Sequence, residues 1–332
     1  MSERPEGDGS PGAVEVTFCV VNTAKRDLLA RGLDAIARER AALPFATETV
    51  VLDNASRDGS PQMAREHPAV DRVIALAERR GKAHCDSELL RSARGRFALL
   101  LNEDSELRDG ATLALHEALS SAPGAALAGA RLIRPSGEAQ ACAWRFPSPW
   151  TALAAAVGLH RLLCVQSRGE RTRQVDWCQS SALLVRREAA RAVGYLDEDF
   201  FVYSDEVDFA RRLRDAGWRS LYVPAAVAVH DEQLSTSPVS APRIVELSRN
   251  RDLYMRKHHS STAARAVRWL TAWAYAVRAV AALVLPGHSP ARYWCHVRAT
   301  LMPARGSGLR ELAEAYNREH PAGPGEPAAH PS

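Results

Sequence analysis

The chain has 332 residues, of which 46% are hydrophobic and 25% are charged, and its formal net charge is +4. This composition is typical of a globular protein with a sizeable core and excludes a disordered chain. The mild positive charge does not argue for nucleic-acid binding, while a local basic surface facing a membrane or a phosphate stays compatible with it. The length fits two domains, or one large α/β domain with an extension.

The two ends of the chain and its cysteines indicate the setting of the protein. Residues 1–12 and 319–332 are polar and rich in glycine and proline, so we expect a disordered leader and a disordered tail. The leader lacks the apolar stretch of a secretion signal. Six cysteines are spread out without a C-x-x-C pair. We therefore expect reduced cytosolic thiols rather than a zinc site or a disulfide framework.

Apolar runs alternate with helical spacings through the first hundred residues. Strands are expected at 14–22, 48–53, 70–76 and 96–104, and helices at 26–41, 60–68 and 84–94. This alternation predicts an α/β fold with a mostly parallel, doubly wound sheet. Ligands of such sheets bind at the carboxyl ends of the strands. Asn22, Asp53 and Asp104 all lie at such ends.

The order of elements changes further along the chain. Strands are expected within 125–137, 175–188 and 219–230, and a helix at 205–218. From 243 to 318 the chain is mostly helical in pattern and rich in arginine between Arg243 and Arg278. We therefore expect an α/β domain at 13–240, followed by a basic helical extension at 241–318.

One stretch of this extension, residues 267–285, is unusually apolar and contains Trp269, Trp273 and Tyr275. Its length is close to the ~20 residues that a membrane span needs. Arg278 lies well inside it, and a charge at the centre of a bilayer costs about 2.5–3.5 kcal/mol on insertion scales. We expect a helix that lies in a bilayer interface or packs on the domain, rather than a span.

Four polar clusters follow the predicted strands, namely Asp53-Asn54, Asn102-Glu103-Asp104, Asp205 to Asp208, and His230. Each has an ordinary structural explanation: an Asx-rich turn, a solvated strand end, a charged first helical turn and a core histidine. Together they supply what transfer from a nucleotide diphosphate needs. Asp104 and His230 suit Mg²⁺ or Mn²⁺, which neutralises a leaving diphosphate, and a further carboxylate suits a general base.

The series of motifs from residue 14 to 260 resembles the family 2 inverting glycosyltransferases, which have a GT-A fold and use nucleotide-sugar donors. "VVLDNASRDGS" resembles the nucleotide-binding turn of that family, and "ARGRFALLLNEDSEL" resembles the strand before its metal-binding D-x-D-like motif. Residues 175–230 resemble its acceptor and catalytic region. "SRNRDLYMRKHHS" resembles a segment of the rhamnosyltransferase-like branch, in which a basic helical C-terminus often sits at the membrane.

The resemblance implies roles for individual residues. Binding of the nucleotide-sugar donor is implied for Asn22, Asp53, Asn54, Asn102 and Asp104. An acceptor and sugar pocket is implied for Trp177, Gln179, Ser180 and Ser181. A divalent cation, Mg²⁺ or Mn²⁺, is implied at Asp104 and His230. The general base is implied at Glu206, with Asp205 as its neighbour, while Glu103 and Glu106 are interpreted as solvated bystanders.

Three positions depart from the family pattern. Asn22 is followed by Thr23 and Ala24, so the aromatic side chain that would stack near the base is missing. Residues 86–88 read Asp-Ser-Glu where the family has N-x-G. The order of the acids is reversed to Asp205-Glu206, so the identity of the base stays open. These differences bear on donor specificity more than on the type of reaction.

We therefore expect a metal-dependent inverting glycosyltransferase, cytoplasmic or peripheral at the inner face of the cell membrane. It would move a hexose or deoxyhexose, with rhamnose as one candidate, to a glycan or lipid-linked acceptor of the cell envelope. The sequence lacks the motifs of serine hydrolases, zinc proteases and nicotinamide dehydrogenases. Two alternatives stay open: a nucleotidyltransferase, for which "NTAKRDLL" lacks a glycine-rich phosphate loop, and a non-catalytic scaffold.

Overall fold

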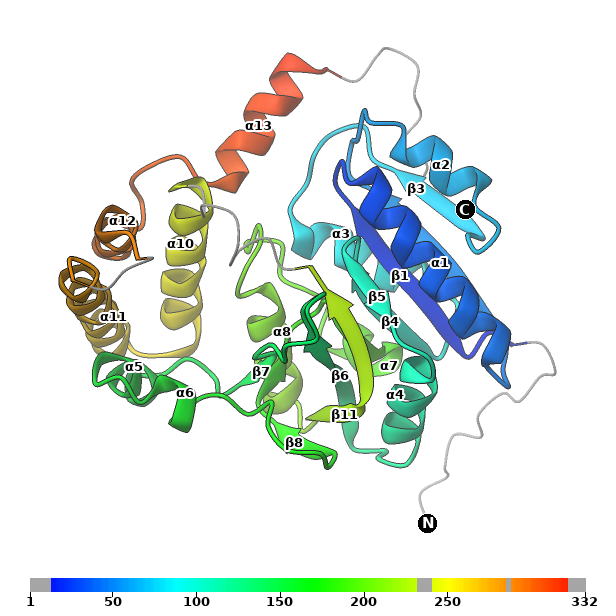
Figure 1. Ribbon diagram of the computed structural model, residues 1–332, viewed down its shortest axis with the longest axis horizontal. Helices are drawn as coiled ribbons and strands as arrows, with labels where there is room; N and C mark the ends of the chain where they lie inside the picture. Colours follow the sequence, from blue (N-terminus) through cyan, green and yellow to red (C-terminus); the bar gives the residue numbers. More distant parts are fainter. Residues whose placement is uncertain (1–12, 232–240, 285–287, 322–332) are drawn as a thin grey trace.

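The computed structural model describes residues 13–231, 241–284 and 288–321. At its centre lies a nine-stranded mixed sheet in the order β3-β2-β1-β4-β10-β6-β11-β5, with β8 paired to β11 (Figure 1). The strands are β1 (Val16–Asn22), β2 (Thr47–Asp53), β3 (Arg72–Ala75), β4 (Phe97–Asn102), β5 (Ser105–Leu107), β6 (Ala125–Ile133), β8 (Arg173–Val175), β10 (Ala182–Arg186) and β11 (Arg219–His230). The predicted α/β class with a mostly parallel sheet is confirmed.

Helices cover both faces of this sheet. They are α1 (Arg26–Ala42), α2 (Ser60–Glu66), α3 (Lys82–Ser92), α4 (Ala111–Ser120), α7 (Arg187–Ala192) and α8 (Asp205–Asp215). α1 and α4 lie over one face, and α3 and α7 lie over the other (Figure 1). β1 and β4 are buried almost throughout, which explains why their sequences are continuous apolar runs rather than alternating ones.

Strand directions bring several polar strand ends together. β1 runs parallel to β2 and β4, so Asn22 lies opposite Asp53, and Asn102 ends β4 beside them. β10 runs antiparallel to β4, and its first residue, Ala182, pairs with Leu101. The carboxyl ends of β1, β2 and β4 and the first residue of β10 therefore lie together at one end of the strands.

β5 is an element that the sequence did not predict. It pairs with the end of β11, where Ser105 lies opposite His230. The chain leaves β4 in the middle of the sheet and joins β5 at its edge, so Glu103 and Asp104 form the link between the two strands. This crossing places the acids that follow β4 next to the histidine that ends β11.

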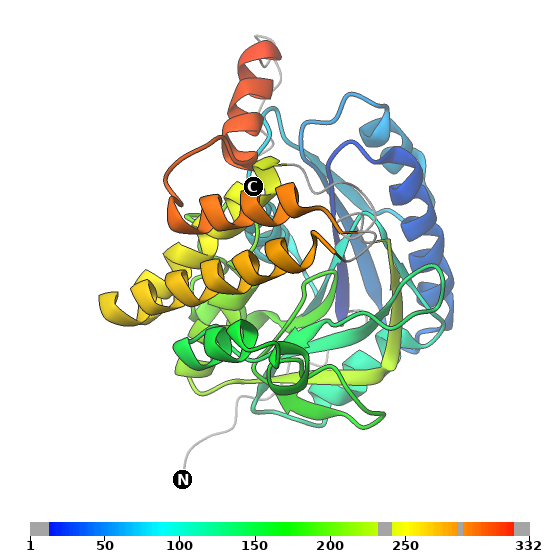
Figure 2. The same ribbon diagram turned by 60° about the vertical axis from the view of Figure 1, so that its left-hand side comes forward.

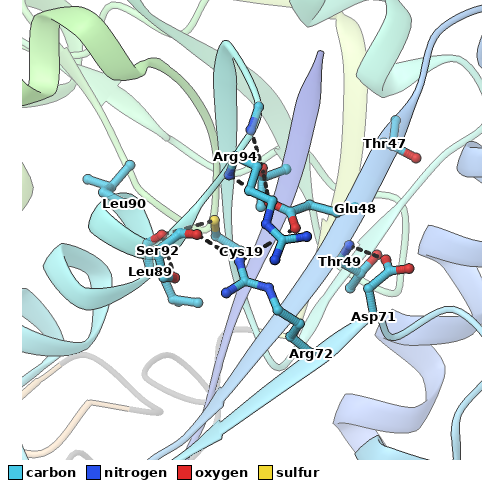
Figure 3. A network of polar contacts seen from close by, with 12 residues as sticks. Cys19, Thr47, Glu48, Thr49, Asp71, Arg72, Leu89, Leu90, Ser92 and Arg94 are labelled. Carbon is cyan, nitrogen blue, oxygen red and sulfur yellow. Dashed lines mark hydrogen bonds and ion pairs between the residues drawn. The ribbon is translucent and has the colours of Figure 1, made fainter. Parts of the chain in front are cut away.

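A buried polar network holds the opposite end of the strands, where β1, β2 and β3 begin (Figure 3). The carboxylate of Glu48 accepts hydrogen bonds from the hydroxyl of Thr17 at 2.9 Å and from the backbone N–H of Arg94 at 2.6 Å. Arg72 lies 3.5 Å from the same carboxylate and donates to the carbonyl of Ser92 at 2.7 Å. These contacts tie the starts of β1, β2 and β3 to the loop that precedes β4.

The described part of the chain beyond residue 240 is helical. Its helices are α10 (Ala241–His258), α11 (Ser261–Ala281), α12 (Pro290–Leu301) and α13 (Leu309–Glu319). The short helices α5 (Pro149–Ala156) and α6 (His160–Leu163) come from the middle of the chain, and α5 packs on α11 (Figures 1 and 2). Within the ranges that the structure describes, no helix combines the length and the apolar character that a membrane crossing requires.

Some of the expected boundaries lie outside the described residues. They include the leader at 1–12, the boundary after residue 240 and most of the tail at 319–332. The division into domains at 13–240 and 241–318 therefore stays a prediction.

Candidate active site

A cavity of about 500 Å³ opens at the carboxyl ends of the strands, where the polar strand ends meet. Four acids line it, namely Glu103, Asp104, Asp205 and Glu206. Five cations line it as well, namely Lys25, Arg79, Arg80, Lys82 and Arg243. Asn54, Asn102, Gln179, Ser180, Ser181 and His230 add neutral polar groups. A cavity of this size with both signs of charge suits a charged ligand that carries several phosphate and hydroxyl oxygens.

Asp104 and His230 face each other within this cavity. Asp104 Oδ1 lies 3.5 Å from His230 Nε2. The histidine is 3% exposed, so its ring is held by the protein rather than by water. The pairing of β5 with β11 produces this contact, because it places the residue before Ser105 against the end of β11.

Hydrogen bonds fix the tautomer of His230. Gln140 donates through Nε2 to the backbone carbonyl of His230 at 2.9 Å, so its Oε1 is the atom that faces His230 Nδ1 at 3.2 Å. Oε1 can only accept, so the ring carries a proton on Nδ1, and Nε2 is the nitrogen that faces Asp104. Asn102 donates to the Ser181 hydroxyl at 3.0 Å, and that hydroxyl lies 3.1 Å from Nε2.

This donor set fits a divalent cation that takes its remaining ligands from a substrate. A carboxylate oxygen of Asp104 and Nε2 of His230 lie close enough to bind one ion. Among the described residues no group of three or more His, Cys, Asp or Glu side chains is arranged to hold a metal by itself. Mg²⁺ and Mn²⁺ commonly complete such sparse protein sites with water and phosphate oxygens.

Asp205 and Glu206 begin α8 and line the cavity together. Tyr203 and Ser204 precede them with positive φ angles of 69° and 63°, a backbone conformation that non-glycine residues rarely adopt and that recurs at functional sites. Asp205 is fully buried, whereas Glu206 is partly exposed. Burial and the charge of Glu206 raise the pKa of Asp205 well above its usual value, although Lys82 opposes the shift.

Lys82 connects these acids to a position that departs from the family pattern. Its Nζ lies 2.7 Å from Asp86 Oδ2, and both residues belong to α3. Burial works against the ammonium form, but Asp86 and Asp205 hold the pKa of Lys82 above its usual value. Asp86 thus supplies the partner of a buried cation that faces the acids of α8.

Glu103 lies at the cavity and is not simply solvated, contrary to its interpretation as a bystander. It lines the cavity, and burial beside the charge of Asp104 raises its pKa to about 7. Glu106, interpreted in the same way, lies on β5 and forms an ion pair with Arg31 at 3.3 Å. The two glutamates differ because the turn before β5 keeps Glu103 at the cavity. The apolar run before them gives no signal of that turn.

Asn22 and Asp53 lie beneath the cavity rather than in its lining, and both are buried. Asp53 Oδ1 accepts from Asn22 Nδ2 at 2.7 Å, and its Oδ2 accepts from the backbone N–H of Ser56 at 2.8 Å. Asn54 does line the cavity, but its amide accepts from the backbone N–H of Arg80 at 2.7 Å and donates to the carbonyl of the same residue at 3.0 Å. These three side chains shape the turn, and their contact with a nucleotide stays a prediction.

The pocket residues expected near the start of β10 are divided by the structure. Gln179, Ser180 and Ser181 line the cavity. Trp177 does not; it belongs to β9 (Trp177–Cys178), which pairs with β7 (Ala143–Trp144). Its ring stacks on that of Trp144 at 4.6 Å between centroids. A role of Trp177 in the acceptor pocket stays a prediction.

Comparison with known proteins places the chain in a family. Residues 11–276 match the model of the family described as "Glycosyltransferase like family 2". N-acetylglucosaminyl-diphospho-decaprenol L-rhamnosyltransferase of Mycobacterium tuberculosis is 30% identical, with 72% of this chain and 85% of the relative covered.

Solved structures agree on the fold. The mannosyltransferase PcManGT of Pyrobaculum calidifontis, solved with GDP-Man and Mn²⁺, has a TM-score of 0.54 at 20% identity and covers 87% of this chain and 85% of its own. GalNAc-T7, solved with UDP, GalNAc and Mn²⁺, has a TM-score of 0.55 at 14% identity, with 94% and 59% covered. The fold is therefore GT-A-like, and the chain belongs to glycosyltransferase family 2.

Proposed function

We propose that the protein is a metal-dependent, inverting glycosyltransferase of cell-envelope polysaccharide synthesis. It moves a hexose or deoxyhexose from a nucleotide-diphosphate sugar to a hydroxyl of a glycan or lipid-linked acceptor. One observation carries the proposal: the Asp104–His230 pair and the partly exposed carboxylate of Glu206 line the same cavity. That cavity has a place for a diphosphate-bound cation and a separate base, which are the two components that an inverting transfer needs.

The side chains of the cavity suggest how the step proceeds. Lys25, Arg80 and Arg243 attract the donor diphosphate. Asp104 and His230 would hold the cation, which neutralises charge on the leaving diphosphate. Glu206 takes the proton of the acceptor hydroxyl. The acceptor oxygen then bonds to the anomeric carbon as the bond from that carbon to the diphosphate oxygen breaks, which inverts the configuration.

Glu206 is favoured over Asp205 as the base. Burial and the charge of Glu206 raise the pKa of Asp205 and disfavour its charged form, which is the form that accepts a proton. Glu206 is partly exposed, so its carboxylate is the more accessible of the two.

Rhamnose is the favoured sugar, and a polyprenyl-diphosphate-linked N-acetylglucosamine is the favoured acceptor, because the relative with 30% identity is named for that reaction. The test is a screen of uridine, guanosine and deoxythymidine diphosphate sugars with this acceptor, with and without Mn²⁺. We expect Mn²⁺-dependent release of a nucleoside diphosphate and a product of inverted configuration. Release of pyrophosphate would favour a nucleotidyltransferase instead, and an absence of metal-dependent nucleotide binding would favour a scaffold.

A second part of the proposal places the protein at the inner face of the cell membrane. One face of α11 exposes Trp269 and Trp273, which are 66% and 62% exposed, and α5 beside it exposes Trp150 at 67%. Further exposed apolar side chains on or beside α5, α6, α11 and α12 are Val157, Leu162, Val280, Leu283 and Trp294. Exposed tryptophans of this kind favour the interface between lipid headgroups and acyl chains.

The charges of these helices suit an anionic lipid surface. As the structure describes them, α5, α6, α11 and α12 contain no Asp or Glu. Their arginines are Arg161, Arg265, Arg268, Arg278, Arg292 and Arg298. Arg268 pairs with Asp252 of α10. Exposed apolar side chains and the other arginines on the same group of helices match a bilayer that carries negative headgroups.

Vesicle flotation tests this placement. We expect the protein to float with phosphatidylcholine vesicles that contain phosphatidylglycerol and to bind less to phosphatidylcholine alone. Replacement of Trp269 and Trp273 by serine should abolish flotation, while Arg65→Gln on the exposed surface of α2 should leave it unchanged. Equal flotation of the tryptophan variant would rule out this surface.

A further inference from the structure

The last described helix, α13, contacts the segments that follow β2 and β3, although it lies far from them in the sequence (Figure 1). It also lies beyond residues 11–276, which match the family model. Its position is notable because Thr23 and Ala24 stand where an aromatic side chain near the base is expected. Resting on the proposed function, we propose that α13 forms a wall of the site for the nucleoside of the donor.

Two side chains hold α13 in place. The amide of Asn317 accepts from the backbone N–H of Arg79 at 2.8 Å and donates to the carbonyl of the same residue at 3.1 Å. The hydroxyl of Tyr316 donates to the carbonyl of Ala55 at 3.1 Å. Ala55 directly follows the turn residues Asp53 and Asn54, so α13 is anchored to the turn at the end of β2.

Two asparagines, Asn317 and Asn54, hydrogen-bond to the backbone of the loop between β3 and α3. Asn317 pairs with the backbone of Arg79, and Asn54 pairs in the same way with the backbone of Arg80. The guanidinium of Arg79 lies 3.5 Å from the centre of the Tyr316 ring. Two asparagines therefore fix the backbone of two cavity-lining arginines, and Tyr316 orients the side chain of one of them.

α13 also contributes directly to the cavity. Leu309, Leu312 and Ala313 line it together with Arg79. Leu312 is 49% exposed, so an apolar side chain faces the opening instead of the protein core. The apolar side chains of this wall suit a nucleobase, which is flat, and they offer nothing to a diphosphate or a cation. The Arg79 guanidinium, oriented by the Tyr316 ring, presents a plane on which a base can stack. The geometry assigns Leu312 and Arg79 to the base.

The test compares ligands with and without a nucleoside. Uridine, guanosine and deoxythymidine diphosphates and inorganic pyrophosphate are titrated by calorimetry in the presence of Mn²⁺. We expect Leu312→Ser and Asn317→Ala each to weaken binding of the preferred nucleoside diphosphate about tenfold, which corresponds to about 1.4 kcal/mol. Affinity for pyrophosphate should not change. Glu314→Ala, on the exposed side of α13, is the matched control and should bind both ligands normally.

The outcomes separate this inference from the function on which it rests. Normal nucleoside diphosphate binding by both variants overturns the role of α13 and leaves the proposed function standing. An equal loss for pyrophosphate also overturns it, because the helix would then act on the diphosphate end. If the wild-type protein binds no nucleoside diphosphate, both ideas fail. Leu312→Ser alters an exposed side chain, so it keeps the test valid even if Asn317→Ala disturbs the docking of α13.

Discussion

Gln140 and His230 make two hydrogen bonds to each other, one through the histidine backbone and one through its ring. The backbone contact determines which way the Gln140 amide points, and the amide then determines which ring nitrogen carries the proton. Gln140 is therefore a positioning residue: it does not line the cavity, yet it decides which atom His230 presents to Asp104.

Replacement of Gln140 by leucine should weaken metal binding without removing a ligand. The ring of His230 would lose the acceptor of its Nδ1 proton, so nothing would hold that proton on Nδ1 and keep Nε2 available as a metal ligand. We expect the Mn²⁺ concentration for half-maximal transfer to rise about 10- to 100-fold, with kcat at saturating Mn²⁺ near normal. Gln140→Glu keeps an acceptor for Nδ1, so its half-maximal Mn²⁺ concentration should rise less. An unchanged Mn²⁺ dependence of Gln140→Leu would refute the assignment.

The two acids of α8 should respond differently to amide substitution. Glu206→Gln removes the proposed base, and we expect kcat to fall about 10²- to 10⁴-fold with little change in the KM for the donor. Asp205→Asn replaces a carboxyl group whose raised pKa disfavours its charged form, so most of the activity should remain. Steady-state transfer kinetics on both variants decide the matter. Loss of activity in Asp205→Asn with retention in Glu206→Gln would reverse the assignment.

His296 predicts a loss of stability in acid. Its ring stacks on Tyr275 with centroids 4.2 Å apart, and burial, reinforced by Arg251, Arg292 and Arg278, lowers its pKa to about 4. Below pH 6.5 the ring of His296 is protonated in the unfolded chain but stays unprotonated in the folded protein until the pH nears 4. The free energy of unfolding therefore falls as the pH drops from 6.5 toward 4.

Urea unfolding at pH 7.5 and pH 5 measures this effect. Replacement of His296 by phenylalanine keeps a ring for Tyr275 and removes the titrating group. We expect the variant to lose less stability than the wild type between the two pH values. An identical loss in both proteins would show that folding does not lower the pKa of His296.

The network in Figure 3 predicts a large effect on stability and none on chemistry. Glu48→Ala leaves the hydroxyl of Thr17, the N–H of Arg94 and the guanidinium of Arg72 without their shared carboxylate. We expect a loss of about 2–4 kcal/mol in the free energy of unfolding. The exposed Glu117→Ala should change it by less than about 0.5 kcal/mol. Equal midpoints of urea unfolding for the two variants would contradict this account.

The parallel part of the fold and one end of the site were predictable from the sequence. Continuous apolar runs marked β1, β2 and β4, and parallel strands place their carboxyl ends at one edge. The structure indeed brings Asn102, Asp104 and His230 to one cavity. These features depend on local periodicity and on a general rule of sheet geometry, both of which a single sequence carries.

The remaining features depend on contacts between distant segments. β5 has three residues, too few for a periodic signal, and it exists because β11 offers a partner. The turn that keeps Glu103 at the cavity therefore has no signal in the sequence. The role of Gln140 depends on a neighbour 90 residues away, and α13 docks through two side chains on a helix that reads as an ordinary amphipathic one. Spacing along the chain contains none of this information.

The pairing of β5 with β11 determines when the candidate active site forms during folding. Asp104 and His230 approach each other only after the edge of the sheet has closed over a long stretch of intervening chain. Contacts of such large sequence separation form slowly, because loop closure costs entropy before the contact repays it. During refolding, the recovery of catalytic competence should therefore lag behind the recovery of helical circular dichroism. A newly made chain would acquire its helices while Asp104 and His230 are still apart.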